Sequence, residues 1–120
     1  MPHDDALPLS VPVYQILVEL AGAPLHGYAL IEEIRDRTGG EVDLTPSTLY
    51  GALHRMLGQK WILEEAETAS DAGGPRRRIY AITETGREVA RAEARRLHRA
   101  ASQAVAVRLL DASGLEPRNP

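Results

Sequence analysis

The sequence predicts a mainly α-helical fold with one small β-hairpin, and three observations lead to this prediction. Apolar residues recur at helical spacing in four stretches of the chain. Glycine, proline and capping residues separate these stretches. A cluster of turn residues at 70–75 divides two short segments that can pair as strands. The expected order is therefore three helices, a hairpin and a long final helix.

The first two helices are short and the link that follows them is tight. Ser10 is the expected N-cap of the first helix, and Gly39-Gly40 ends the second, as glycine commonly does. The link to the third helix covers only residues 41–44. A second and a third helix with such a short connection are typical of a helix-turn-helix. The expected ranges are 12–21 and 27–38.

The third helix, expected at residues 46–59, has one apolar side and one side that could contact DNA. Thr45 is a good N-cap, and Pro46 suits the first helical position. The apolar side carries Leu49, Leu53, Met56 and Leu57. The candidate DNA-binding residues at its start and on its polar side are Thr45, Pro46, Ser47, Thr48, Tyr50, His54 and Arg55. A recognition helix needs this layout, although capping and periodicity alone would also fit an ordinary amphipathic helix with a solvated face.

A hairpin is expected next, with strands at 61–69 and 76–83. Three helices followed by a hairpin is the order of a winged helix-turn-helix, in which the hairpin is the wing. Arg76, Arg77 and Arg78 lie just past its tip. We expect these arginines to contact phosphates rather than bases. Alternation along the strand directs Arg77 away from the other two, so all three need not contact DNA.

The final helix is expected at residues 85–110, with Thr83 or Thr85 as its cap and Thr85 and Glu88 as a capping box. Its first half carries four arginines spaced four apart, with glutamates at pairing distance. Its second half is apolar and outruns the preceding domain, so it needs another surface. A second copy of the same helix is the simplest partner, and folding back on its own domain is the alternative. The proposed dimer seam is Leu97, Ala101, Ala104, Val105 and Leu109.

These elements divide the chain into three parts. A winged helix-turn-helix domain is expected at 10–84, a C-terminal dimerisation helix at 85–112, and a frayed tail at 113–120.

Composition and charge narrow the class of protein. The chain has 120 residues, no cysteine and a net charge of −3. Residues 1–45 carry 8 acidic and 2 basic side chains, whereas residues 46–99 carry 7 acidic and 10 basic ones. Positive charge therefore gathers in the half that holds the candidate recognition helix. The start of the chain does not look like a signal peptide, and no apolar run is long enough to span a bilayer. We expect a cytoplasmic protein without a membrane partner.

Enzymatic activity is not expected. The four histidines are scattered without metal-ligand spacing, and no phosphate-binding glycine loop is present. The paired carboxylates are adjacent in sequence, so they diverge on a helix or strand. No catalytic residue, metal site or cofactor is predicted. His26 could donate to a phosphate near the start of the second helix, but a structural or solvent-facing role is favoured.

The chain resembles the PadR family of bacterial transcriptional regulators. Three motifs carry the resemblance, in the expected order: Leu25-His26-Gly27-Tyr28, Thr45-Pro46-Ser47-Thr48-Leu49-Tyr50, and the run from Arg77 to Arg87. The single helix after the wing is similar to the shorter subfamily. One departure is Gly51, where the family often has proline. The resemblance implies a homodimeric repressor that binds double-stranded DNA and is relieved by a small-molecule effector.

Two other functions remain open. A winged helix can bind another protein, although Arg55, Lys60 and residues 76–78 favour DNA. Ligand sensing at the dimer centre could also be the main activity. Residues 97–110 contain no aromatic side chain to stack on a ligand, so such a site would need Tyr14 or Trp61.

Overall fold

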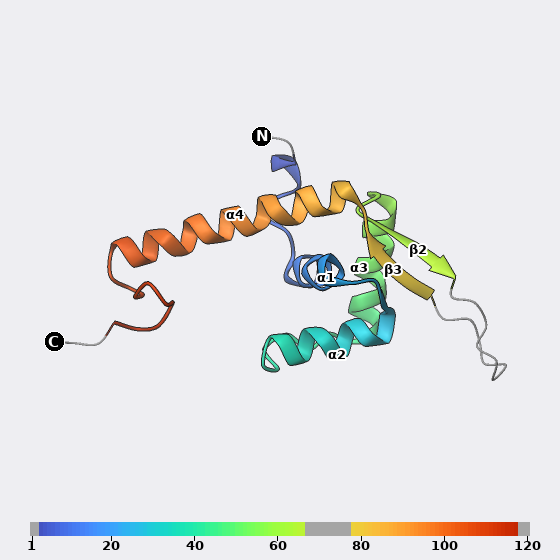
Figure 1. Ribbon diagram of the computed structural model, residues 1–120, viewed down its shortest axis with the longest axis horizontal. Helices are drawn as coiled ribbons and strands as arrows, with labels where there is room; N and C mark the ends of the chain where they lie inside the picture. Colours follow the sequence, from blue (N-terminus) through green and yellow to red (C-terminus); the bar gives the residue numbers. More distant parts are fainter. Residues whose placement is uncertain (1–2, 67–77, 118–120) are drawn as a thin grey trace.

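The computed structural model describes residues 3–66 and 78–117. Within this part of the chain, α1, α2 and α3 pack together beside a small sheet, and α4 runs across them and beyond (Figure 1). The fold is mainly helical with a small β component, as the sequence predicts. The elements in order are η1 (Asp4–Ala6), α1 (Val11–Gly22), β1 (Leu25–His26), α2 (Gly27–Arg37), α3 (Pro46–Gly58), β2 (Ile62–Ala66), β3 (Arg78–Ile82) and α4 (Glu84–Ala106).

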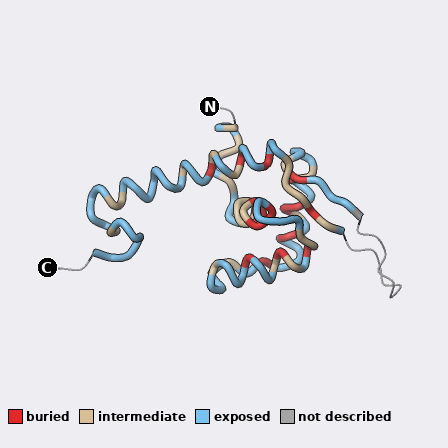
Figure 2. The backbone as a smooth tube through the Cα atoms, viewed as in Figure 1, coloured by how far each residue is buried: buried red, intermediate tan, exposed pale blue. Residues whose placement is uncertain are grey.

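The core lies between the three short helices, one side of the sheet and the first half of α4 (Figure 2). The first three helices contribute at apolar positions three and four apart, which is why these segments fold as amphipathic helices. Ser10 and Thr45 cap α1 and α3 by accepting from the N–H groups of Val13 and Thr48. Both caps were predicted. The buried hydrophobic residues are Val13, Ile16, Leu17, Leu20, Leu30, Ile34, Leu44, Leu49, Ala52, Leu53, Met56, Ile62, Tyr80 and Val89.

The sheet has three strands in the order β1-β3-β2, all antiparallel. The sequence predicts the β2–β3 hairpin but not β1. That strand has only two residues, Leu25 and His26, which pair with Tyr80 and Ile79. Two residues are too few to show an alternating pattern, so only the chain's return beside β3 makes them a strand.

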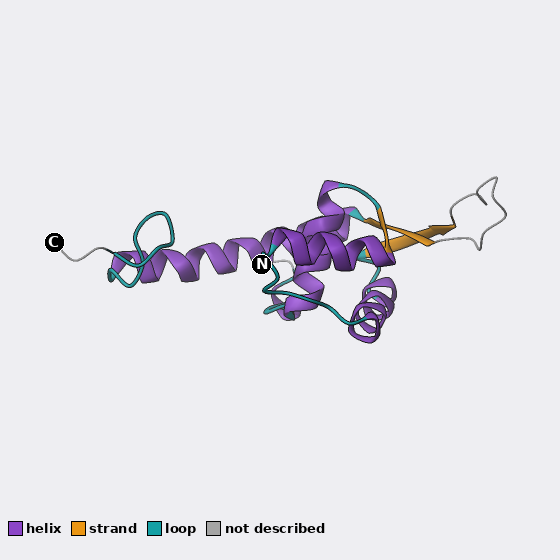
Figure 3. Ribbon diagram, turned by 90° about the horizontal axis from the view of Figure 1, so that it is seen from below, coloured by secondary structure: helices purple, strands orange, loops and turns teal. Residues whose placement is uncertain are grey.

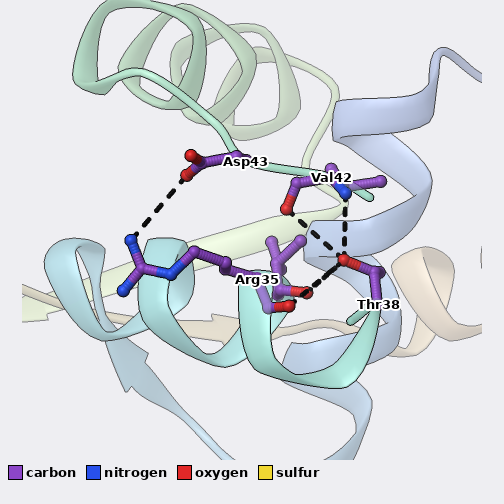
Figure 4. Close-up of polar contacts among 5 residues, drawn as sticks. Arg35, Thr38, Val42 and Asp43 are labelled. Carbon is purple, nitrogen blue, oxygen red and sulfur yellow. Dashed lines mark hydrogen bonds and ion pairs between the residues drawn. The ribbon is translucent and has the colours of Figure 1, made fainter. Parts of the chain in front are cut away.

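The link between α2 and α3 is closed by a single side chain (Figure 4). The Thr38 hydroxyl accepts from the N–H of Val42 at 3.0 Å and donates to the carbonyl of Ile34 at 2.8 Å. Gly39 and Gly40 follow with φ of 63° and 85°, a conformation that glycine adopts without strain. An ion pair between Arg35 and Asp43 spans the same link at 3.9 Å. The entry of the chain into α3 is therefore fixed relative to α2.

Of the two caps that the sequence predicts for α4, Thr83 is the one that the structure shows. Thr83 caps the helix by accepting from the N–H of Gly86 at 3.0 Å, so the capping box of Thr85 and Glu88 is wrong. The Thr83 hydroxyl is also within donating distance of the carbonyls of Lys60 at 2.7 Å and Trp61 at 2.9 Å, so tertiary contacts hold this cap in place. Gly86 lies close to the Trp61 carbonyl, and a Cβ built on Gly86 would lie 2.0 Å from the carbonyl oxygen.

A second correction concerns the end of α4, which stops at Ala106 rather than at Leu110. Arg108 takes a φ of 64°, and the N–H of Leu109 bonds back to the Ala104 carbonyl. The Asp111 carboxylate then accepts from the Ser113 hydroxyl at 2.6 Å and from the N–H groups of Leu115 and Ser113, which closes a turn and lowers the pKa of Asp111. Leu109 therefore lies in this turn and not on the helix.

The distal half of α4 projects from the body, and the strands β2 and β3 point away at the other end of the molecule (Figures 1 and 3). The longest dimension is 63 Å. Side chains on α4 are buried only as far as Glu93. Beyond that residue the helix makes too few contacts within the chain to be covered (Figure 2).

The N-terminal segment packs along the first half of α4, which the sequence does not predict. The buried carboxylate of Glu93 accepts from the Leu9 N–H at 2.6 Å and also pairs with Arg96. His3 pairs with Glu88 at 2.8 Å. Glu88 and Glu93, which the sequence places at pairing distance from the arginine stripe, therefore have partners outside that stripe.

Candidate nucleic-acid interface

One side of α3 is solvent-exposed over its whole length. The apolar residues Leu49, Leu53 and Met56 are almost completely buried. The opposite side carries every candidate DNA-binding residue of this helix in an exposed position: Thr45, Pro46, Ser47, Thr48, Tyr50, His54 and Arg55. Among the described residues, none of these seven makes an ion pair. The helix is held by its buried side, so its polar side is available for a ligand.

Helical spacing divides this exposed side into three strips. Ser47 and His54 lie along its centre, because they are about two turns apart. Thr48 and Arg55 form one flank, and Tyr50 lies on the other. Arg55 lines a small hollow with the N-terminal segment and the end of α3. It is therefore turned away from Tyr50 and His54.

Tyr50 is held in place by a close contact with the start of α2. A Cβ built on Gly27 would lie 2.7 Å from the hydroxyl oxygen of Tyr50 and 3.1 Å from its ring. The absence of a side chain at Gly27 leaves room for the tyrosine ring over the helix start. The side chain remains 44% exposed. This contact gives a physical reason for the spacing between the Leu25-His26-Gly27-Tyr28 motif and the tyrosine of α3.

The wing contributes one candidate residue to the described part of the interface. Arg78 opens β3 and is exposed, and its guanidinium donates to the Glu64 carboxylate of β2 at 2.5 Å. The other two predicted wing arginines, Arg76 and Arg77, lie outside the described residues.

Tyr50, His54 and Arg78 come together around one hollow of about 320 Å³ between α3 and the wing, which Glu64 also lines. The structure therefore joins three of the predicted residues into one surface. Residues 45–48 lie at the start of α3, and Arg55 lies on its far flank.

A second, larger hollow shares Tyr50 and Arg78 and was not predicted. It has a volume of about 720 Å³ and lies between the start of α2, α3 and β3. Its further lining includes His26, Tyr28, Glu32 and Tyr80. Burial raises the pKa of Tyr80, and the nearby Glu64 carboxylate and Tyr50 add to this effect. The Leu25-His26-Gly27-Tyr28 motif was the available signal, but only the return of β3 beside β1 brings it to Tyr80.

An ion pair links α2 to α1. The buried carboxylate of Glu19 on α1 accepts from Arg37 in the last turn of α2, and this bond raises the pKa of Arg37. Cations are favourable at a helix C-terminus. The pair therefore links the end of α2 to α1.

The described residues form neither a metal site nor a membrane-spanning helix. No three histidine or acidic side chains in the described residues lie together as metal ligands. None of the described helices is both long and apolar enough to span a bilayer.

Comparison with known proteins matches this chain to one family. Residues 16–92 match the model of the transcriptional regulator PadR-like family. An uncharacterized 37.1 kDa protein in transposon TN4556 of Streptomyces fradiae is 34% identical over 84 residues. That alignment covers 70% of this chain but only 22% of the Streptomyces protein, so the chain spans about a fifth of that relative.

Solved structures share the fold. A PadR family transcription regulator from Clostridium difficile has a TM-score of 0.65 at 26% identity, covering 80% of this chain and 99% of that one. A PadR-like transcriptional regulator from Bacillus cereus has a TM-score of 0.67 at 24% identity, covering 81% and 90%. Bacillus subtilis PadR, solved in complex with operator DNA, has a TM-score of 0.59 at 21% identity, covering 68% and 45%.

The family match runs from within α1 to the first turns of α4, and it includes α2, α3, β2 and β3, the elements that build the exposed surface described above. It assigns the chain to regulators rather than enzymes, as the sequence predicts. The chain belongs to the PadR-like family of transcriptional regulators.

Proposed function

We propose that this protein is a sequence-specific DNA-binding repressor that acts in the cytoplasm as a homodimer on an inverted-repeat operator. The exposed polar side of α3 is the observation that carries the proposal. It presents hydroxyl groups at the start of the helix and donors one and two turns later. Recognition helices contact base edges with residues of this kind near their N-terminus.

The proposed contacts on α3 are Thr45, Pro46, Ser47, Thr48, Tyr50, His54 and Arg55. Their positions in the three strips suggest which of them contact bases and which contact phosphates. Ser47 and His54 at the centre face the floor of the major groove, whereas Tyr50 and Arg55 on the flanks reach the two phosphate backbones. The wing arginines 76–78 would lie along the adjacent backbone.

Dimerisation through the distal half of α4 is the second part of the proposal. The proposed seam is Leu97, Ala101, Ala104 and Val105 on the helix, together with Leu109 in the turn that follows it. Leu97 is 40% exposed and Leu109 is 69% exposed, although both are large apolar side chains. Ala104 and Val105 are half-buried. A second copy would cover this surface, and its two-fold symmetry would match an inverted repeat with half-sites about 10 base pairs apart.

The third part of the proposal is that a small molecule relieves repression. A small molecule that changed the angle between the two α4 helices would change the distance between the two recognition helices. Even a small change would lose the simultaneous fit to both half-sites, and with it the affinity gained by two-site binding.

Footprinting on the DNA upstream of the protein's own gene tests the central claim. We expect protection of an inverted repeat, with the two protected half-sites on the same face of the duplex. If folded protein at moderate salt protects no site, the DNA-binding proposal is wrong and a protein-binding winged helix is favoured instead. Repression is tested separately by transcription of a reporter from the protected promoter in vitro.

A further inference from the structure

The larger hollow beside α3 gathers most of the chain's aromatic side chains. The protein has four tyrosines, one tryptophan and no phenylalanine. Three of these five, Tyr28, Tyr50 and Tyr80, line the same hollow of about 720 Å³. They come from α2, α3 and β3, so the fold brings them together from distant parts of the sequence. We call this hollow the tyrosine groove.

The tyrosine groove has the size and the lining of a small-molecule site. Its volume is within the range of about 300–1,000 Å³ that is usual for ligand pockets. Tyr28 is 67% exposed and Tyr50 is 44% exposed, so their rings are accessible, while Tyr80 is 5% exposed and forms part of the floor. A few polar groups accompany the rings, which is the usual composition of a ligand site.

The charges around the tyrosine groove favour a cationic ligand. Arg78 is engaged by the carboxylate of Glu64, so that pair carries no net charge. Glu32 also lines the groove and makes no ion pair with any other described residue. Within the described part of the chain, the carboxylate of Glu32 therefore remains without a charged partner beside the three aromatic rings. The faces of tyrosine rings carry negative potential and attract cations, most strongly where water is displaced.

The position of the tyrosine groove connects it to regulation. Tyr50 and Arg78 line it and are also proposed DNA contacts. A molecule seated between them would occupy the space through which the duplex reaches α3 and the wing. Binding of such a ligand and binding of DNA would then exclude each other by direct overlap, with no change in the dimer.

We propose that the tyrosine groove binds lipophilic organic cations, and that a bound cation excludes DNA. The first part stands on the groove alone. The second part rests on the proposed DNA-binding function. This mechanism differs from a change in the angle between the α4 helices, because it acts on each protomer separately.

A matched pair of ions tests the first part without DNA. Tetraphenylphosphonium and tetraphenylborate have nearly the same size and apolar surface but opposite charge. Calorimetric titration of the full chain should give a dissociation constant about tenfold lower for the phosphonium ion, within the range of cation–π interactions. Equal affinities, or tighter binding of the borate, would overturn the proposal.

Substitutions locate the binding. Tyr28→Ala removes an exposed ring and leaves the core intact, and it should weaken phosphonium binding about three- to tenfold, whereas Tyr28→Phe should retain it. Glu32→Gln should weaken binding by a similar factor. Glu33→Gln is the matched control, since it removes the same charge from the neighbouring position of α2 but does not line the groove. Unchanged binding in both Tyr28→Ala and Glu32→Gln would show that the ion binds elsewhere.

The second part is tested with a fluorescent duplex that carries the footprinted operator. Tetraphenylphosphonium should raise the apparent dissociation constant for DNA at the concentrations that fill the groove, and Glu32→Gln should shift this effect to higher ion concentrations. If the ion binds the groove and DNA affinity does not fall, exclusion is wrong. If the protein binds no DNA at all, the proposed function fails, while the calorimetric result on the groove remains valid.

Discussion

The guanidinium of Arg78 and the carboxylate of Glu64 are hydrogen-bonded across the wing at 2.5 Å. The two residues are on neighbouring antiparallel strands, and Arg78 is paired with Ala66, two residues along β2 from Glu64. Arg78 is thus the one described wing arginine and is held by an acidic neighbour on the surface that we propose for DNA. An anion such as a phosphate must compete with this carboxylate for the guanidinium.

Removal of that competitor should strengthen DNA binding. Glu64→Gln keeps the shape of the side chain but releases Arg78, and we expect tighter binding to specific and non-specific duplexes alike. Arg78→Gln should weaken both and reduce the log–log salt slope by about one unit, because one phosphate contact is lost. Fluorescence anisotropy over a salt series measures both quantities.

Glu65→Gln is the control for this comparison, because it removes the same charge one residue along β2, where side chains point to the other face of the sheet. Equal gains in affinity for the Glu64 and Glu65 variants would mean that net charge, rather than release of Arg78, is responsible. An unchanged salt slope for Arg78→Gln would rule out a phosphate contact by this residue.

The two helical glycines at positions 51 and 86 should respond in opposite ways to alanine. A Cβ on Gly86 would meet the Trp61 carbonyl at 2.0 Å, so Gly86→Ala should destabilise the protein by about 3 kcal/mol, the upper end of the usual cost of overpacking. A Cβ on Gly51 would meet only the Arg55 guanidinium at 3.7 Å. Gly51→Ala should therefore stabilise by about 0.5–1 kcal/mol through helix propensity. Urea unfolding followed by circular dichroism measures both, and equal effects would contradict this packing.

The buried carboxylate of Glu93 should make stability depend on pH. The hydrogen bond from Arg96 lowers the pKa of Glu93, the Leu9 N–H lowers it further, and burial opposes them. A carboxyl group with a lowered pKa in the folded state stabilises the protein above its unfolded pKa of about 4.3. This contribution is lost as the pH falls through 4.3 and then through the lower folded value.

Glu93→Gln tests this dependence. The amide cannot ionise, so the variant should be less stable at pH 7, and its stability should fall less than that of the wild type between pH 7 and pH 4. Urea unfolding at both pH values gives the comparison. Glu88→Gln serves as the control, because that carboxylate is half exposed. A parallel fall in the wild type and in Glu93→Gln would exclude Glu93 as a source of the pH dependence.

A charge in the proposed seam of α4 should separate the dimer. Val105→Glu would place a carboxylate in an apolar interface without a partner, at a cost of several kcal/mol. We expect monomers in sedimentation velocity, a preserved helical signal and a large loss of DNA affinity. Gln103→Glu adds a charge on the opposite side of the helix and should remain dimeric. A dimeric Val105→Glu that still binds DNA would exclude this helix as the principal interface.

The sequence determined those features that depend on neighbouring residues. The caps of α1 and α3, the proline that opens α3 and the apolar spacing of each helix are local properties, because they depend on hydrogen bonds and faces within a few residues. They predicted the helices, the hairpin and the exposed side of α3 correctly. The motifs around Gly27, Tyr50 and residues 77–87 also predicted the family.

Only the tertiary structure decided what lies between distant segments. β1 exists because two residues return beside β3, and the Thr83 hydroxyl that caps α4 also contacts the carbonyls of Lys60 and Trp61. The same holds for Glu93, whose partners include the N–H of Leu9, and for the three rings of the tyrosine groove. Each of these contacts joins residues far apart in the chain. Their energies depend on distances that packing sets, and no local pattern of residues records those distances.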